Sequence, residues 1–171
     1  MKNTREVNIG GVRIGGGNRI AVQSMTNTRT SDKEATLRQI KELAAAGCDI
    51  VRCTVNDAEA VKSVEYLVEN SPVPLVADIH FDYKLAIAAA ERGIAKIRIN
   101  PGNIGDKANV KKVADACRAR NIPIRIGING GSAEKSVLAK YGGPTAEALA
   151  ESALLNARML KKPGFAISCF R

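Results

Sequence analysis

The sequence predicts an α/β protein of parallel β/α units, about five and a half of them, arranged as a partial (β/α)8 TIM barrel. Three observations support this prediction. Short segments rich in Val and Ile alternate with longer amphipathic segments at intervals of roughly 20 to 30 residues, as in β/α units. Polar residues recur near the carboxyl ends of four consecutive predicted strands. No low-complexity linker interrupts the pattern, so the 171 residues are expected to form one domain.

An N-terminal β-hairpin is expected before the β/α units. Residues 5–9 and 12–17 are short strand-like segments, and the Gly10-Gly11 pair between them suits a tight turn because glycine reaches positive φ easily. The glycine-rich segment 12–17 does not resemble a P-loop, because no Lys-Ser/Thr pair follows it and it does not precede a helix. We therefore interpret it as the second hairpin strand.

The first β/α unit pairs a strand at 20–26 with a helix at 32–46. Ser31 and Glu34 have the spacing of a capping box, and Gly47 is expected to end the helix. Further strands are expected at 49–55, 74–81, 95–100, 123–129 and 164–170, and further helices at 57–70, 83–93, 109–120 and 145–162.

Two architectures accommodate this order of elements. An open, doubly wound sheet fits the chain length, because a complete barrel needs about 250 residues. Part of a barrel fits the polar pattern better, because the carboxyl ends of all barrel strands meet at one mouth. The barrel explains the repeated polar residues with a single cause, and we prefer it.

The polar residues share one face of their strands, because side chains two positions apart on a strand point the same way. They are Arg52 and Thr54, Asp78 and His80, Arg98 and Asn100, and Arg125 and Asn129, with a weaker version at Gln23 and Met25. The alternate positions on the same strands are apolar, for example Val51, Ile97 and Ile124.

The charges on the polar face do not balance. Three arginines, Arg52, Arg98 and Arg125, face a single acid, Asp78. One arginine paired with a buried carboxylate would be a structural salt bridge, but three exceed what one carboxylate can neutralise. Arginine presents a rigid fork of donors that suits phosphate oxygens. The sequence therefore predicts an anion site, with the single histidine, His80, as a candidate proton donor.

Composition excludes several other classes of protein. The net charge is +9, but Lys and Arg are dispersed and there is no Trp for base stacking, so nucleic acid is not an expected partner. No apolar run reaches the roughly 20 residues of a membrane span, and the first ten residues are too polar for a signal peptide. The four cysteines form no C-x-x-C pair. Reduced thiols in the cytoplasm and no metal site are the expectation.

Five motifs together resemble the 4-hydroxy-3-methylbut-2-enyl diphosphate synthase family: "IAVQSMTNT", "PLVADIHFDY", "RINPGNIG", "IPIRIG" and "LAKYGGPT". The resemblance implies a (β/α)8 barrel followed by a domain that holds a [4Fe-4S] cluster. It also implies an oxidoreductase of the methylerythritol phosphate route of isoprenoid (terpenoid) biosynthesis. Such an enzyme reductively opens 2-C-methyl-D-erythritol 2,4-cyclodiphosphate, a cyclic diphosphate, with electrons from ferredoxin or flavodoxin, and is a homodimer.

By the same resemblance, the polar strand ends would hold the diphosphate of the substrate. The residues concerned are Arg52, Asp78, His80, Arg98, Asn100, Arg125 and Asn129.

The chain departs from the family in two respects. It is expected to end at the sixth strand, so that residues 1–171 form a single, incomplete N-terminal barrel domain without the cluster domain and its ligands. The family's sixth-strand Lys is replaced by Phe170. Such a chain is expected to be an N-terminal fragment, inactive alone. The alternatives are a barrel enzyme resembling dihydropteroate synthase, or a catalytically inert anion-binding fragment.

Overall fold

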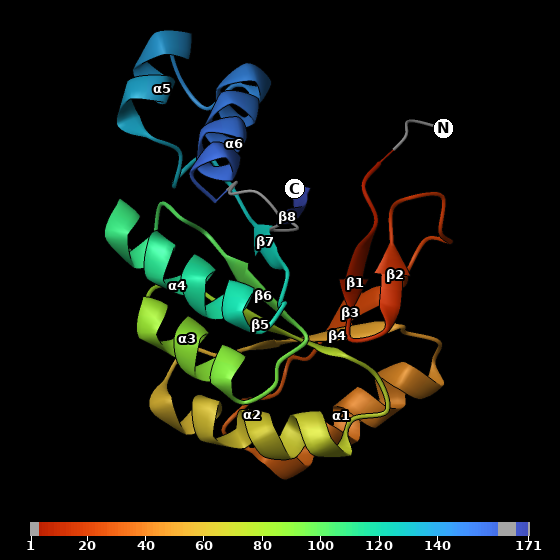
Figure 1. Cartoon of the computed structure of the whole chain (residues 1–171). Coiled ribbons are helices and arrows are strands. Elements are labelled where there is room, and N and C mark those ends of the chain that lie inside the picture. Colours follow the sequence, from red (N-terminus) through yellow and green to blue (C-terminus); the bar gives the residue numbers. More distant parts are fainter. Residues whose placement is uncertain (1–3, 161–166, 171) are drawn as a thin grey trace.

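The computed structural model describes residues 4–160 and 167–170 (Figure 1). Six parallel strands form one sheet in the order β3-β4-β5-β6-β7-β8, so each strand pairs with the next one along the chain. They are β3 (Gln23–Met25), β4 (Ile50–Thr54), β5 (Leu75–Ile79), β6 (Lys96–Ile99), β7 (Ile124–Ile126) and β8 (Ile167–Phe170). A doubly wound sheet reverses its strand order at a switch point, whereas a barrel does not. The strand order therefore favours the barrel over the open sheet.

The helices follow the strands in strict alternation up to β7. They are α1 (Lys33–Ala45), α2 (Ala58–Asn70), α3 (Tyr83–Glu91), α4 (Lys107–Ala119), α5 (Lys135–Tyr141) and α6 (Ala146–Leu160). Figure 1 shows α1 to α4 side by side along one face of the sheet, with the hairpin on the other side. Apolar side chains from both layers, such as Val51, Ile97 and Ile124 from the sheet and Ile40 and Val113 from the helices, form the main core.

The inner face of the sheet has a second, smaller core at its amino end. The predicted hairpin is confirmed as β1 (Val7–Ile9) paired antiparallel with β2 (Val12–Ile14). Its buried residues Val7 and Ile9 pack with Ile50 of β4 and Val76 of β5. The hairpin thus covers the amino end of the described strands, away from the predicted polar residues at their carboxyl ends.

Aspartates begin the four helices α1 to α4. The side chains of Asp32, Asp57, Asp82 and Asp106 each accept a hydrogen bond from a first-turn backbone N–H. The prediction that Ser31 caps the first helix is wrong, because the Asp32 carboxylate accepts from Ala35 N at 3.0 Å and a carboxylate also interacts favourably with the helix dipole. Gly47 follows the end of α1 at φ +97°, as predicted.

Two elements near the C-terminal end, α5 and β8, compare differently with the sequence prediction. Helix α5 lies in the segment 130–143, for which neither a helix nor a strand was predicted, and it ends at Gly142 in the left-handed conformation. The last expected strand, 164–170, is present as β8 beside β7, while its residues 164–166 lie outside the described residues. Among the described helices, none has the length and apolar character needed to cross a membrane.

Candidate functional site

Asp78 occupies the centre of the polar cluster at the carboxyl ends of the strands. It lies on β5, and its side chain is only 4% exposed. Its Oδ1 accepts a hydrogen bond from Nη1 of Arg98 at 2.9 Å, and its Oδ2 lies 3.5 Å from Nε of Arg52. Nε2 of His80 lies 3.6 Å from Oδ1. Residues from three neighbouring strands and the loop after β5 thus converge on one carboxylate.

The structure brings two of the three predicted arginines onto this carboxylate. Arg52 and Arg98 both contact Asp78, so the salt-bridge interpretation describes their geometry. It does not balance their charge, because one carboxylate faces two guanidinium groups. Arg125 lies on β7 directly opposite Arg98 in the strand register and is half-buried. Because Arg52 and Arg98 share the single carboxylate of Asp78, this part of the site keeps an excess of positive charge, which suits an anion.

Met25 makes an additional contact that the sequence indicated only weakly. Nε and Nη2 of Arg52 donate to the Met25 sulfur at 3.2 and 3.1 Å. A thioether is a weak, neutral acceptor, so it orients the guanidinium without neutralising it. The contact therefore does not reduce the positive charge of Arg52.

The two predicted asparagines differ in their placement. Asn100 is buried, and its Nδ2 donates to Oγ of Ser132 at 2.7 Å while its Oδ1 accepts from Gly102 N at 3.2 Å. Asn129 is exposed, and its backbone N–H and C=O both bond to the Ser132 hydroxyl. Asn100 thus joins the loop after β6 to the loop after β7, whereas the Asn129 side chain lies at the surface.

Ser132 was missed by the sequence analysis. Its hydroxyl links Asn100 to Asn129 and so ties two loops at the mouth of the sheet. A serine three residues after an asparagine in a glycine-rich turn is a common local motif for such a bond, and that spacing was the available signal.

His80 lies partly exposed beside Asp78. Its side chain is 39% exposed, compared with 4% for Asp78 and 20% for Arg98. The ring therefore reaches from the buried carboxylate toward solvent at the mouth. A histidine in this place can donate a hydrogen bond or a proton to an oxygen of a bound molecule.

The described residues do not fit an iron–sulfur cluster. No group of three or more His, Cys, Asp or Glu side chains that could hold a metal ion occurs among them. Burial raises the pKa of the Cys53 thiol to about 11 and that of the Cys117 thiol to about 12, so both stay protonated at neutral pH. A cluster ligand must be a thiolate. Both thiols pack in the core between the sheet and the helices.

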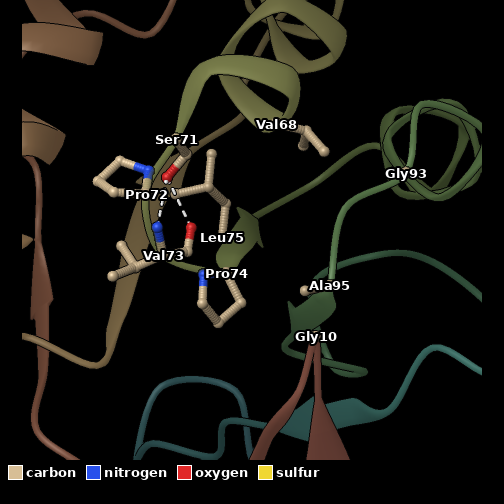
Figure 2. Close-up of a pocket in the computed structure, with 9 residues that line it drawn as sticks. All are labelled: Gly10, Val68, Ser71, Pro72, Val73, Pro74, Leu75, Gly93 and Ala95. Atoms are coloured by element: carbon tan, nitrogen blue, oxygen red, sulfur yellow. Dashed lines mark hydrogen bonds between the residues drawn. The ribbon is translucent and has the colours of Figure 1, made fainter.

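A separate hollow lies at the opposite, amino end of the strands. Figure 2 shows Gly10 at the tip of the hairpin facing Pro74 and Ala95, with Ser71 and Val73 joined by hydrogen bonds above Pro74. The hollow measures about 310 Å³. None of the seven predicted site residues lines it. In barrels the amino end serves stability and the carboxyl end carries function.

Comparison with known proteins confirms the family predicted from the motifs. The GcpE TIM-barrel domain matches residues 4–170. Two similar relatives are both named 4-hydroxy-3-methylbut-2-en-1-yl diphosphate synthase (flavodoxin). The relative from Clostridium perfringens is 54% identical over 164 residues, which are 96% of this chain and 47% of that protein. The relative from Caldanaerobacter subterraneus is 57% identical over 96% of this chain and 46% of its own length. The chain spans about half the length of these relatives.

Solved structures support the barrel fold. A dihydropteroate synthase from Vibrio fischeri superposes with a TM-score of 0.67 over 95% of this chain and 63% of its own, at 12% identity. One from Xanthomonas albilineans gives 0.61 over 95% and 68%, at 16% identity. At such identities the likeness concerns the fold alone, and it confirms a barrel of parallel β/α units. By the match over residues 4–170, the chain belongs to the GcpE TIM-barrel domain family.

Proposed function

We propose that this chain is the substrate-binding barrel portion of a 4-hydroxy-3-methylbut-2-enyl diphosphate synthase. The family match and the two similar relatives support the reaction class, an oxidoreductase of isoprenoid biosynthesis by the methylerythritol phosphate pathway. The substrate would be 2-C-methyl-D-erythritol 2,4-cyclodiphosphate, whose two phosphate groups match the charge of the strand ends.

The observation that carries the proposal is the excess of positive charge around Asp78. In the proposed site, Arg52, Arg98 and Arg125 bind phosphate oxygens through charge-assisted hydrogen bonds, which are the strong ones. Asp78 holds two of these guanidinium groups in place without neutralising both. His80 donates a hydrogen bond or a proton at the mouth.

The two asparagines complete the proposed site. Asn100 shapes the loop after β6 through Gly102 and Ser132, and Asn129 offers an exposed amide at the rim.

The cofactor and partners of the proposed enzyme come from its relatives. Flavodoxin is the electron donor in the names of the relatives, and we extend it, or ferredoxin, to this chain. A [4Fe-4S] cluster would need ligands other than the described cysteines. A cytoplasmic homodimer is the expected form of the complete enzyme.

Substrate binding tests the proposal directly. The 171-residue chain is titrated with the cyclodiphosphate by calorimetry, beside its Arg98→Lys variant. Lysine keeps the charge but loses the fork, so binding is expected to weaken about tenfold, or about 1.4 kcal/mol. Lys111→Met is the control, because Lys111 lies on α4 in an exposed pair with Asp115.

Two results would overturn the proposal. One is the absence of saturable binding by the unmodified chain, as expected of an inert fragment. The other is equal affinity of the unmodified chain and Arg98→Lys. A parallel titration with an oligonucleotide at two salt concentrations separates a specific diphosphate site from general attraction to a chain of net charge +9.

A further inference from the structure

Gly127 stands on the inner face of the sheet between Arg125 and Asn129, immediately after β7. It is buried, and its N–H donates to the Ile99 carbonyl at 2.9 Å, which continues the ladder between β6 and β7. Its φ lies outside the left-handed region, unlike that of ten other glycines of the described chain. The backbone at this position therefore does not require glycine.

The space above Gly127 is filled by the guanidinium group of Arg98. A Cβ atom added to Gly127 would lie 2.6 Å from Nε and 2.8 Å from Cζ of Arg98, and closer still to Nη2. Cβ atoms essentially never approach other heavy atoms within 3.0 Å. Any side chain at this position must displace the guanidinium.

The cost of this displacement depends on what holds the guanidinium in place, because it is the far end of a flexible side chain. Its Nη1 is hydrogen-bonded to Asp78 at 2.9 Å on the side of β5, while its Nε and Nη2 lie over Gly127 on the side of β7. The group thus spans the inner face from β5 to β7. Moving it off Gly127 is therefore expected to weaken the bond to Asp78.

We propose that Gly127 is a positioning residue. Its missing side chain leaves a space, here called the seat, that holds the Arg98 guanidinium against Asp78 and beside Arg125. The step from this seat to anion binding rests on the proposed function. The seat itself rests only on the geometry of Gly127, Arg98 and Asp78.

A double-mutant cycle in stability tests the seat without any ligand. The full 171-residue chain is unfolded by urea as the unmodified protein, Gly127→Ala, Arg98→Ala and the double variant. Gly127→Ala is expected to raise the unfolding equilibrium constant about tenfold, or about 1.4 kcal/mol. In the Arg98→Ala background the same change is expected to be neutral, because the methyl group enters the space that the guanidinium has left.

Gly131→Ala is the matched control for the cycle. It lies four residues further on, also with φ outside the left-handed region, and an added Cβ would meet only Asn129 Oδ1 at 3.7 Å. This variant is expected to keep the urea midpoint. If Gly127→Ala alone fails to fold, the double variant is expected to recover folding. An equal cost of Gly127→Ala with and without Arg98, or failure of both variants to fold, would overturn the proposal.

Two further measurements separate positioning from simple stability. The arginine Nε–H resonance that Arg98→Ala removes is expected to shift in Gly127→Ala and to stay in place in Gly131→Ala. Inorganic pyrophosphate, used as the probe, is expected to bind folded Gly127→Ala about tenfold more weakly, with no further loss when it is combined with Arg98→Ala. An unmoved resonance would contradict the seat.

The outcomes for the two proposals remain distinct. If pyrophosphate binds no form of the chain while the stability cycle shows coupling, the seat stands and the proposed function fails. If pyrophosphate binds and depends on Arg98, but Gly127→Ala binds it equally well, the proposed function stands and the positioning role fails.

Discussion

The two ends of the sheet's inner face differ in chemistry although the same strands build both. At the amino end, Ile50 and Val76 pack under the hairpin in an apolar core. Two residues further along the same strands, Arg52 and Asp78 form the charged cluster. Side chains two positions apart on a strand share a face. A shift of two residues along β4 and β5 therefore leads from the packed apolar core to the charged cluster.

Lys96 shows that the division is not absolute. It lies opposite Val76 in the register, on the same face as Arg98, and is 2% exposed. A charged residue thus occurs within the layer below the mouth. The comparison nevertheless implies that mutations at the carboxyl end act on the charged cluster, through stability, anion binding or both, whereas mutations at the amino end change stability alone.

The largest expected effect is that of Asp78→Asn at the carboxyl end. The change leaves two guanidinium groups without a buried negative partner, which is expected to lower the free energy of unfolding by about 3 kcal/mol in urea denaturation. Asparagine keeps an oxygen for Arg98 and removes a negative charge, so the affinity of the folded protein for pyrophosphate is not expected to fall. Asp115→Asn on the exposed surface of α4 serves as the control, with little change in stability. Unchanged stability of Asp78→Asn would show that the two guanidinium groups do not need the negative charge of Asp78 for the protein to fold stably.

The second-largest expected effect is that of Gly10→Ala at the amino end of the strands. Gly10 has φ +54°, and an added Cβ would lie 2.7 Å from Cβ of Pro74. Gly10→Ala is expected to lower the free energy of unfolding by about 2 kcal/mol, from backbone strain and this clash. Pyrophosphate affinity is expected to stay the same. Gly11→Ala separates the two causes, because Gly11 has φ +97° with nothing within 4 Å of an added Cβ, so only strain remains. Weaker pyrophosphate binding by folded Gly10→Ala would contradict the separation of the two ends.

The smallest expected effect concerns the main core between the sheet and the helices. This core lies on the other face of the sheet from the two regions compared above. The pKa of the Cys117 thiol is raised by burial from 9.0 to about 12, so the folded chain keeps a proton that the unfolded chain loses. The contribution of this thiol to stability is therefore complete below pH 9 and is lost as the pH rises from about 9 to about 12. The loss at pH 9 is about 0.4 kcal/mol, when half of the unfolded thiol is ionised. Urea midpoints of the unmodified chain and Cys117→Ala are compared from pH 8 to pH 10. A difference that does not shrink with rising pH would contradict the burial of this thiol.

The sequence by itself determined the alternation of elements and the two faces of the strands. The period of two along 49–55, 74–81, 95–100 and 123–129 placed Arg52, Asp78, Arg98 and Arg125 on the inner face. It placed apolar residues on the outer face: Val51, Ile79, Ile97, Ile99, Ile124 and Ile126. Local patterns suffice for this because a strand's side-chain direction depends on parity alone. Local patterns placed the N-cap of α1 one residue too early. Ser31 and Asp32 are both good capping residues, and the path of the preceding loop makes Asp32 the cap.

Only the tertiary structure decided how the polar residues meet. Arg98 and Asp78 are 20 residues apart in the chain, Arg52 and Met25 are 27 apart, and Asn100 and Ser132 are 32 apart. Their contacts depend on strand register and loop packing, which no local spacing encodes. The same holds for Gly127, whose role comes from the Arg98 side chain of the neighbouring strand and not from its own backbone. Strand parity selects the face of a residue, and the pairing of distant strands selects its partners.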